Sequence, residues 1–449
     1  MKFKYKIKGL GSIKEAEIDI APFTLIAGKN NTGKSFATKS LYCILEALND
    51  DYVATLLAKL YVRIRSKFFE FSNELHKPAL IDNKFFDFFE EHYLKLLDDI
   101  LRQVQNNDEI ILKIFVNDLK NALMRIEDYI EKRKKVQKFK GIIQSIREIE
   151  SITKQIIDIS EEPIKYIVKA IDKNLNINFK NNFEITSFSS ILNIDNKKHK
   201  LLLDIGNIGK IEIDSNLEQL EFSLSRDGVK KIQQLSNVIY IDSPVYAKLM
   251  KLLSGKTYLS DLLGNDKFLK DYPLYVDRFY TFLEKKYIDK PEFLHLSNKI
   301  QKIINGKLKI DNNKNINFIY QNKNIPISLT AMGVTNIGIV DMLIRNNSIN
   351  KGSFLIIDEP EVHLHPEWQV EFVNILYDIA KAGANVIITS HSIDIVKAVE
   401  LLSKNDSENI AINKMPYTKE FQNKTIEEKI GDILDDLNSP YYRMYMDGL

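Results

Sequence analysis

The stretch Gly28-Lys29-Asn30-Asn31-Thr32-Gly33-Lys34-Ser35 decides the fold, because it matches the phosphate-binding loop pattern G-x-x-x-x-G-K-[ST]. The apolar run Phe23-Thr24-Leu25-Ile26-Ala27 before it is typical of a buried parallel strand. After it, apolar residues recur at the spacing of a helix: Ala37, Leu41, Ile44 and Leu48. A phosphate-binding loop requires this order of strand, loop and helix, which disfavours an incidental glycine-rich turn.

In such a loop the glycines allow the backbone to bend, so that successive N–H groups point at phosphate oxygens. The N-terminus of the following helix adds partial positive charge. Lys34 would reach the β- and γ-phosphates of ATP, and the Ser35 hydroxyl would bind Mg²⁺. We therefore predict a nucleotide-binding segment made of Gly28, Lys29, Asn30, Asn31, Thr32, Gly33, Lys34, Ser35 and Phe36.

A second signal is an apolar run that ends in two carboxylates, Phe354-Leu355-Ile356-Ile357-Asp358-Glu359. Both carboxylates would lie at the tip of a buried strand. Asp358 is placed to hold Mg²⁺ through its water shell, and Glu359 to orient and deprotonate the attacking water. Capping of the next helix is the alternative role for this pair.

A third signal is Thr389-Ser390-His391-Ser392, which follows the apolar run Val386-Ile387-Ile388. A helix near 366–382 separates the two runs, so they predict a βαβ unit in a parallel sheet. The His391 imidazole would then lie at the sheet edge, where it can sense the γ-phosphate and position water. We predict Lys34, Glu359 and His391 as catalytic residues and Ser35 and Asp358 as metal ligands; a helix cap is the alternative role for His391.

Together these elements resemble the ABC-type ATPase heads of the RecF, SMC and Rad50 class, and more closely the OLD-like AAA-family ATPases of bacterial defence systems. The resemblance is carried by Gly11–Ile18 before the loop, by Asp358–Pro366 and by Thr389–Ser392, and it covers about residues 1–50 and 325–400. It implies an α/β fold with a mixed sheet flanked by helices. It also implies two heads stacked head to tail, a switch role for His391, and a loop at Glu361–His365 that crosses the dimer interface.

The resemblance also implies a signature segment that faces the partner's ATP, and Leu329–Gly338 is the candidate. The family has a serine two residues before a glycine at the start of a helix. Counting back from Gly333 puts Ala331 there, so the hydroxyl is missing, and Thr330 would substitute if the loop shifts by one. The backbone at Gly333 would still face the γ-phosphate. Slow hydrolysis is the expected consequence. Three candidates remain for the family's glutamine loop: Gln233, Gln234 and the turn Asp242-Ser243-Pro244.

The remaining segments predict a helical insertion in the ATPase head. Residues 51–179 look almost wholly helical, and the apolar seams at 119–130 and 142–156 predict a short antiparallel, coiled-coil-like hairpin. The head would consist of residues 1–50 and 180–449, with strands from about 180 to 245 and a helical segment at 247–305.

Composition excludes several classes of protein. No apolar run approaches the roughly 20 residues of a membrane-spanning helix, and the single cysteine, Cys43, rules out an internal disulfide. We expect a cytoplasmic protein without a membrane partner. A net charge of +2 gives no general attraction to nucleic acid. Nucleic acid would have to bind a local basic patch: Lys132, Arg133, Lys134, Lys135, Lys138 and Lys140.

Two functions remain open. The first is a dimeric ATPase, a homodimer or higher homo-oligomer, that couples ATP hydrolysis to DNA sensing in anti-phage defence or DNA repair. The second is a slow ATPase scaffold that regulates a separate effector encoded nearby, such as a nuclease or toxin. Some relatives carry a Toprim nuclease domain; about 50 residues follow the helix after His391, too few for one, so we expect none here. A transporter subunit is a weaker third reading.

Overall fold

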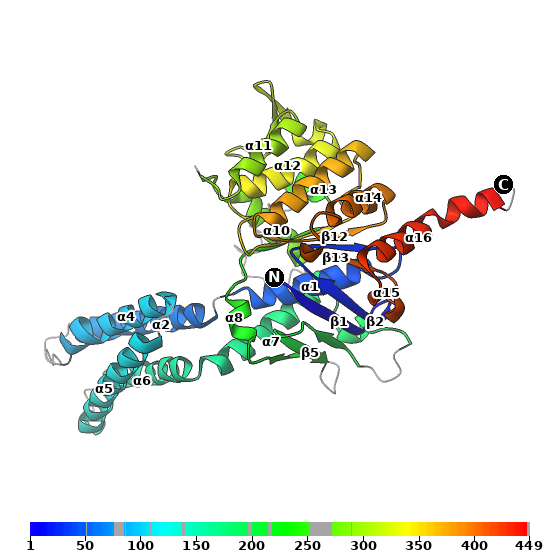
Figure 1. The fold of residues 1–449 in the computed structure, drawn as a ribbon. Coiled ribbons are helices and arrows are strands. Elements are labelled where there is room, and N and C mark those ends of the chain that lie inside the picture. The colour runs from blue at the N-terminus through cyan, green and yellow to red at the C-terminus, as the bar shows by residue number, and fades with distance from the viewer. Residues whose placement is uncertain are drawn as a thin grey trace. The chain divides into compact units, whose positions relative to one another are not determined.

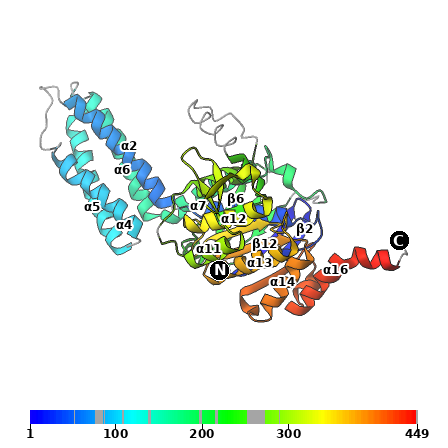
Figure 2. The ribbon, with the colours of Figure 1, turned by 90° about the horizontal axis from the view of Figure 1, so that it is seen from above.

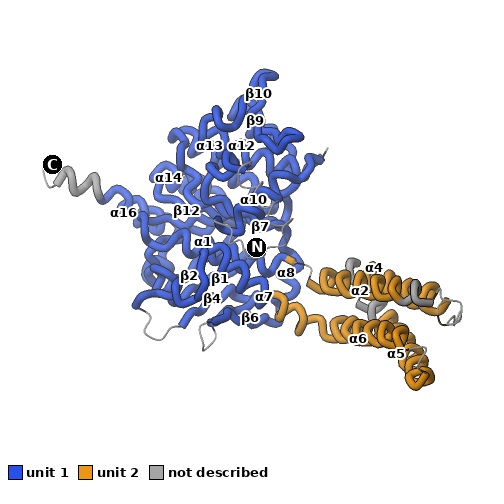
Figure 3. Tube along the Cα trace, turned by 180° about the vertical axis from the view of Figure 1, so that it is seen from behind, with its two compact units in different colours: residues 1–49, 172–449 blue, residues 50–171 orange. Residues whose placement is uncertain are grey.

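The computed structural model of the protein describes residues 1–50, 52–75, 85, 87–106, 109–136, 140–195, 200–213, 218–250, 272–288 and 290–446. They form two compact units, one of residues 1–49 and 172–449 and one of residues 50–171 (Figure 3). The boundaries predicted from the sequence lie after residues 50 and 179. The second predicted boundary differs from the observed one, which lies between residues 171 and 172. Helix α7 (Pro163–Asn182) continues across the observed boundary, so the sequence has no turn or loop that marks it.

A five-stranded parallel sheet holds the predicted site. In spatial order its strands are β13 (Ile410–Lys414), β3 (Phe23–Ala27), β12 (Asn385–Ser390), β11 (Phe354–Asp358) and β7 (Val238–Ile241). Nearly every side chain in them is buried, as is usual in parallel sheets covered on both faces. The predicted βαβ unit is confirmed, since β11 and β12 pair in parallel with α13 (Pro366–Lys381) between them in the chain. The loops that follow these strands therefore meet at one edge of the sheet.

An antiparallel sheet forms the other layer of this unit. Its order is β2 (Ile13–Ile20), β1 (Phe3–Leu10), β4 (Leu202–Asp204), β5 (Gly209–Ile213) and β6 (Leu220–Leu224). Helix α1 (Lys34–Leu48) lies between the two sheets (Figure 1). It packs on β7, β11 and β12, and its Ser40 hydroxyl is hydrogen-bonded to the Tyr5 hydroxyl of β1 at 2.7 Å. The helix that starts at the phosphate-binding loop is thus held on both sides.

The remaining elements of the first unit are mostly helical. They are α8 (Gly228–Ile232), α10 (Leu274–Glu284), α11 (Leu294–Ile303), α12 (Met332–Arg345), α14 (Ile393–Ser403), α15 (Lys419–Gln422), α16 (Ile426–Met446), and the short 3₁₀ helices η3 (Phe188–Ile191), η4 (Ile327–Leu329) and η5 (Ser407–Asn409). Helix α13 packs on β12 and on α14 (Figure 2). Of the predicted helical segment at 247–305, residues 251–271 and 289 lie outside the described residues.

Two further predictions from the sequence concern the last third of the chain: the alternation of Ile316, Phe318 and Tyr320 predicts a hairpin strand, and Thr425-x-x-Glu428 predicts a capping box that opens a helix. The alternation around Ile316–Tyr320 is a strand in a small antiparallel sheet of β10 (Lys323–Pro326), β9 (Ile316–Tyr320) and β8 (Lys307–Ile310). The predicted capping box before α16 is confirmed in both directions. Thr425 N donates to Glu428 Oε2 at 2.8 Å, and Glu428 N donates to Thr425 Oγ1 at 3.3 Å.

The second unit is a helical bundle. Its elements are α2 (Tyr52–Leu75), the π-helix η1 (Phe88–Tyr93), α4 (Leu94–Asn106), α5 (Glu109–Arg133), α6 (Lys140–Glu161) and the first half of α7. The two predicted seams lie on α5 and α6, which pack on each other. They do not form an isolated hairpin, because α2 packs on α6 and α4 packs on α5, so one apolar core is shared. In the part of the chain that the structure describes, no helix is both long and apolar enough to span a membrane.

Candidate nucleotide site

The loop between β3 and α1 depends on its two glycines. Gly28 has a φ of 152° and Gly33 a φ of 95°, which side chains rarely permit. A Cβ on Gly28 would lie 2.1 Å from the Met415 carbonyl oxygen, and one on Gly33 would lie 2.6 Å from Ile13 Cγ1. Both positions therefore require glycine for conformation and for space. Gly28 N donates to Ser390 O at 3.2 Å, which ties the loop to the end of β12.

The side chain of Lys34 lies along the loop. Its Nζ donates to the carbonyl oxygens of Gly28 at 2.8 Å and Lys29 at 2.9 Å, and the residue is only 5% exposed. Burial lowers the pKa of the Lys34 amino group, while the carboxylates of Glu359, Glu361 and Asp358 oppose this effect. A phosphate oxygen could replace either carbonyl as acceptor. The loop carbonyls thus hold the Lys34 amino group beside the loop where phosphate would bind.

The other predicted loop residues differ in how exposed they are. Lys29, Asn30, Asn31 and Ser35 are exposed, and Thr32 is half-buried with its hydroxyl donating to Lys29 O at 2.8 Å. Lys29 also forms an ion pair with Asp436 of α16, at 2.7 Å.

Phe36 follows the loop in the first turn of α1. Its ring stacks on Phe183, with 5.7 Å between the ring centroids, so its side chain packs within the fold. Any contact of Phe36 with a nucleotide would come from its backbone N–H.

Asp358 is 8% exposed and accepts hydrogen bonds from three hydroxyls. They come from Thr38 on α1 (2.9 Å), Tyr240 on β7 (2.6 Å) and Thr389 on β12 (3.2 Å). Thr38 is one turn beyond Ser35, so the structure brings the two predicted metal ligands to the same place. Sequence reasoning missed Thr38 and Tyr240. Their signals were a hydroxyl one helical turn after the loop and a tyrosine inside a buried strand.

Glu359 and His391 face each other across the ends of β11 and β12. Glu359 has a φ of 51°, and its N donates to Thr389 O at 3.1 Å. Its carboxylate is 34% exposed, and Glu359 Oε1 lies 3.3 Å from His391 Nδ1. The capping alternatives are wrong: His365 is the N-cap of α13, and Ser392, whose hydroxyl accepts from Ile395 N at 3.4 Å, is the N-cap of α14.

The three candidates for the glutamine loop lie at opposite edges of the parallel sheet. Gln233 and Gln234 precede β7, and the Gln234 carbonyl packs beside Gly352, before β11. Asp242 follows β7, at the edge that carries Asp358. Its carboxylate accepts a hydrogen bond from the Tyr275 hydroxyl, and burial raises its pKa. Of the three candidates, only the turn at 242–244 therefore lies at the same edge of the sheet as Asp358.

The candidate signature segment begins α12. Ala331 is the N-cap residue, and no side chain caps this helix end. Thr330 is buried, and its hydroxyl donates to Pro326 O at 3.1 Å. Gly333 is also buried, since a Cβ there would lie 3.0 Å from His363 O. Among the described residues, no hydrogen bond joins Thr330 or Gly333 to the loop at 28–35.

The predicted basic patch is partly neutralised by its own helix. Lys132 pairs with Asp128 at 2.6 Å, and Lys134 pairs with Glu131. The Arg133 guanidinium lies 4.0 Å from the centre of the Tyr129 ring. Lys138 lies outside the described residues.

Comparisons with known proteins show the family to which the chain belongs. The AAA ATPase domain family matches residues 1–396, and the chain belongs to that family. It is 24% identical over 424 residues to Endonuclease GajA of Bacillus cereus (strain HuB5-5), a match that covers 85% of this chain and 53% of GajA. It is 31% identical over 96 residues to Septu protein PtuA of Bacillus thuringiensis, which covers 20% of this chain and 24% of PtuA. The chain thus spans about half the length of GajA.

Solved structures give weaker likenesses. The SMC head domain from Thermotoga maritima matches with a TM-score of 0.33 and 9% identity, over 88% of this chain and 91% of that one. The SmcHead bound to the C-winged helix domain of ScpA matches with a TM-score of 0.37 and 9% identity, over the same shares. Nothing about function follows from these two likenesses.

Proposed function

We propose that the chain binds ATP with Mg²⁺ at this sheet edge and hydrolyses it to ADP and phosphate. The observation that carries the proposal is the hydrogen bond between Thr38, one turn after the loop serine, and Asp358. It joins the two halves of a nucleotide site that lie far apart in the sequence.

The residues present suit magnesium, because Ser35 offers an exposed hydroxyl and Asp358 a carboxylate, and Mg²⁺ prefers oxygen ligands. When bound, the ion would neutralise charge between the β- and γ-phosphates. Lys34 would donate to the same phosphates from its place along the loop.

Glu359 supports the chemical step. Its partly exposed carboxylate can orient a water and accept its proton as the water oxygen bonds to the γ-phosphorus and the bond to the β–γ bridging oxygen breaks. His391 faces the same carboxylate and would hold it in place while contacting the γ-phosphate.

The active form in this proposal is a homodimer or higher homo-oligomer, in which Thr330 and Gly333 of one copy approach the loop of another. Leu329, which ends η4, and Ala331, the N-cap of α12, are exposed and could meet a partner. The Thr330 hydroxyl is already used within its own turn, which supports slow turnover.

The proposed setting is a bacterial anti-phage defence or DNA-repair system, with coupling of ATP turnover to DNA. The names of the relatives, an endonuclease and a Septu protein, fit this setting. The second candidate is a slow scaffold that regulates a separate effector. The ion pairs of Lys132 and Lys134 favour it, because they weaken the basic patch on which DNA binding would rest.

One set of experiments tests both candidates. Purified protein should bind a fluorescent ATP analogue only with magnesium and should release phosphate from ATP. Duplex or single-stranded DNA should raise turnover in the first case, and exchange of Lys132, Lys134 and Lys135 for Gln should remove the increase. In the second case DNA should have no effect, and the product of a neighbouring gene should copurify with the Glu359→Gln protein. Failure to bind ATP would refute both.

A further inference from the structure

The loop after Glu359 contains a third carboxylate that the proposed chemistry does not use. Glu361 is only 7% exposed. Its Oε1 accepts two hydrogen bonds, from Ser390 Oγ at 2.8 Å and from the backbone N of His391 at 2.9 Å. The resemblance to known ATPases places Glu361 in a loop between two copies. In the structure it points into its own chain.

Glu361 also faces the histidine ring. Its Oε1 lies 3.4 Å from His391 Nδ1, and Glu359 Oε1 lies 3.3 Å from the same nitrogen. One imidazole nitrogen is thus flanked by two carboxylates, one partly exposed and one buried. Nδ1 has no hydrogen-bond partner among the described residues, so the two carboxylates lie beside it without a hydrogen bond, and Nε2 is left for another partner.

The loop that carries Glu361 is held from a second direction by α12. Asn336 Nδ2 donates to Pro360 O at 3.1 Å, and Gly333 packs against His363 O. Glu361 is therefore anchored on both sides, by β12 and by α12. An anchored carboxylate can set the position of the histidine more closely than a mobile one can.

A carboxylate is an expensive choice for this place. The two donors that it satisfies need only a neutral acceptor, and burial of a charged group is unfavourable. Glu361 Oε2 is buried and has no hydrogen-bond partner among the described residues, and burial raises the pKa of this carboxyl group. This unfavourable burial indicates that the Glu361 carboxylate has a role beyond accepting the two hydrogen bonds.

We propose that Glu361 is a positioning residue, which holds His391 through its backbone and its ring so that His391 and Glu359 work as a pair. This inference rests on the proposed ATPase function. Glu361 itself touches neither nucleotide nor water in this role.

The central experiment compares Glu361→Gln with the wild type. Glutamine keeps the size and one acceptor oxygen but removes the charge. We expect thermal stability not to fall, Mg-ATP affinity to stay within about twofold of the wild-type value, and kcat to fall at least about tenfold, since general acid–base groups contribute that much or more. Glu367→Gln, an exposed residue in the first turn of α13, is the matched control and should change neither quantity. A merely structural role would lower stability and affinity as well.

A double-mutant cycle with His391→Ala tests whether Glu361 acts through His391. If Glu361 acts through His391, adding Glu361→Gln to His391→Ala should cause no further loss in single-turnover hydrolysis. Equal losses in both backgrounds, or a Glu361→Gln protein with wild-type kcat, would overturn the inference while leaving the ATPase proposal intact. A wild-type protein that releases no phosphate would instead refute the proposed function, and the role of Glu361 with it.

Discussion

The same residue types, lysines and carboxylates, meet in two regions of the first unit with different results. At the carboxyl edge of the parallel sheet, Lys34 and Asp358 are nearly fully buried. On the outer face of the antiparallel sheet, the lysines of β1 pair with the carboxylates of β2, and the lysine side chains are about half exposed. These pairs include Lys6 with Glu17 at 3.2 Å and Lys8 with Glu15 at 3.1 Å.

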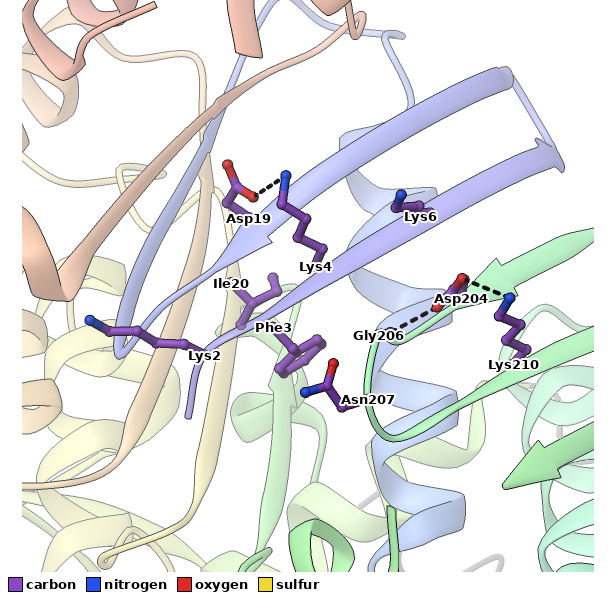
Figure 4. Close-up of a pocket in the computed structure, with 10 residues that line it drawn as sticks. All are labelled: Lys2, Phe3, Lys4, Lys6, Asp19, Ile20, Asp204, Gly206, Asn207 and Lys210. Atoms are coloured by element: carbon purple, nitrogen blue, oxygen red, sulfur yellow. Dashed lines mark hydrogen bonds and ion pairs between the residues drawn. The ribbon is translucent and has the colours of Figure 1, made fainter. Parts of the chain in front are cut away.

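The outer face even has a hollow of about 540 Å³. Figure 4 shows its charged lining, which is Lys2, Lys4, Lys6, Asp19, Asp204 and Lys210. Lys4 pairs there with Asp19 at 3.6 Å, and Lys210 with Asp204 at 3.5 Å. Water screens such pairs, so each contributes little. Burial of charged groups, rather than their number, therefore marks the region where chemistry is expected.

The largest expected effect is the loss of nucleotide binding when Lys34, at the carboxyl edge of the parallel sheet, is replaced. Lys34→Met removes the amino group that the loop positions, and we expect Mg-ATP affinity to fall by at least about 100-fold. Titration with a fluorescent ATP analogue measures this. Lys6→Met, the matched change on the exposed sheet, should leave affinity unchanged. Comparable binding by both variants would remove the distinction between the two regions.

Glu359→Gln should separate binding from chemistry. We expect kcat to fall by about 100-fold or more, because the general base is lost, while bound ATP is retained. Phosphate release and nucleotide retention after gel filtration measure the two quantities. Light scattering should find two or more copies with ATP. A variant that turns over ATP normally would exclude Glu359 as the base.

Loss of a hydroxyl beside Asp358 should affect stability. Tyr240→Phe and Thr38→Val each remove one donor from a buried carboxylate, and we expect a loss of about 1–3 kcal/mol in the free energy of unfolding. Urea denaturation measures it. Thr32→Val, which removes an exposed loop hydroxyl bonded to a nearby carbonyl, should cost less. Equal costs would mean that Asp358 does not depend on these donors.

The two regions should also respond to pH with opposite signs. Burial raises the pKa of Glu361 above its ordinary value of 4.5, so the free energy of unfolding should fall as pH rises from 4.5 through the raised pKa. The hydrogen bond from Lys4 lowers the pKa of Glu17, so its contribution is present above 4.5 and is lost as pH falls through the lowered pKa.

Urea denaturation from pH 7 down to below the lowered pKa of Glu17 measures the two slopes. Glu361→Gln should flatten the decline with rising pH, and Glu17→Gln should flatten the loss at acid pH. Identical curves for the wild type and both variants would contradict the assignment.

The smallest effect is expected for Lys4→Met. The pairs that it breaks, with Glu17 and Asp19, are exposed, so the loss in the free energy of unfolding should stay below about 1 kcal/mol. It should shrink further at 1 M salt, where the screening length is about 3 Å. Denaturation at low and high salt checks both statements. A loss that exceeds that of Tyr240→Phe would reverse the ranking.

The sequence predicted the parts of the fold whose signals are local. The loop between β3 and α1 and the capping box at Thr425 each depend on residues that are near neighbours in the chain, and the βαβ unit of β11, α13 and β12 depends on apolar patterns that follow one another along it. These elements then place Asp358, Glu359 and His391 at one edge by the rules of parallel sheets.

The rest depends on contacts between distant residues. Thr38 and Tyr240 reach Asp358 across 320 and 118 positions of sequence, and no periodicity encodes such a meeting. The inward direction of Glu361 likewise follows from where β12 ends. The shared core of the insertion was missed for the same reason, since a single helix pattern does not reveal how many neighbours pack on it.

Asp358 joins three elements that are distant in the chain, because α1, β7 and β12 each contribute one hydroxyl to it. An Asp358→Ala protein would therefore remove an acceptor from three buried hydroxyls at once, and an inactive variant of this kind would say little about magnesium. Asparagine keeps one acceptor but turns an amide group toward a hydroxyl. The informative dissection starts from the surrounding hydroxyls, one at a time, with the carboxylate left in place.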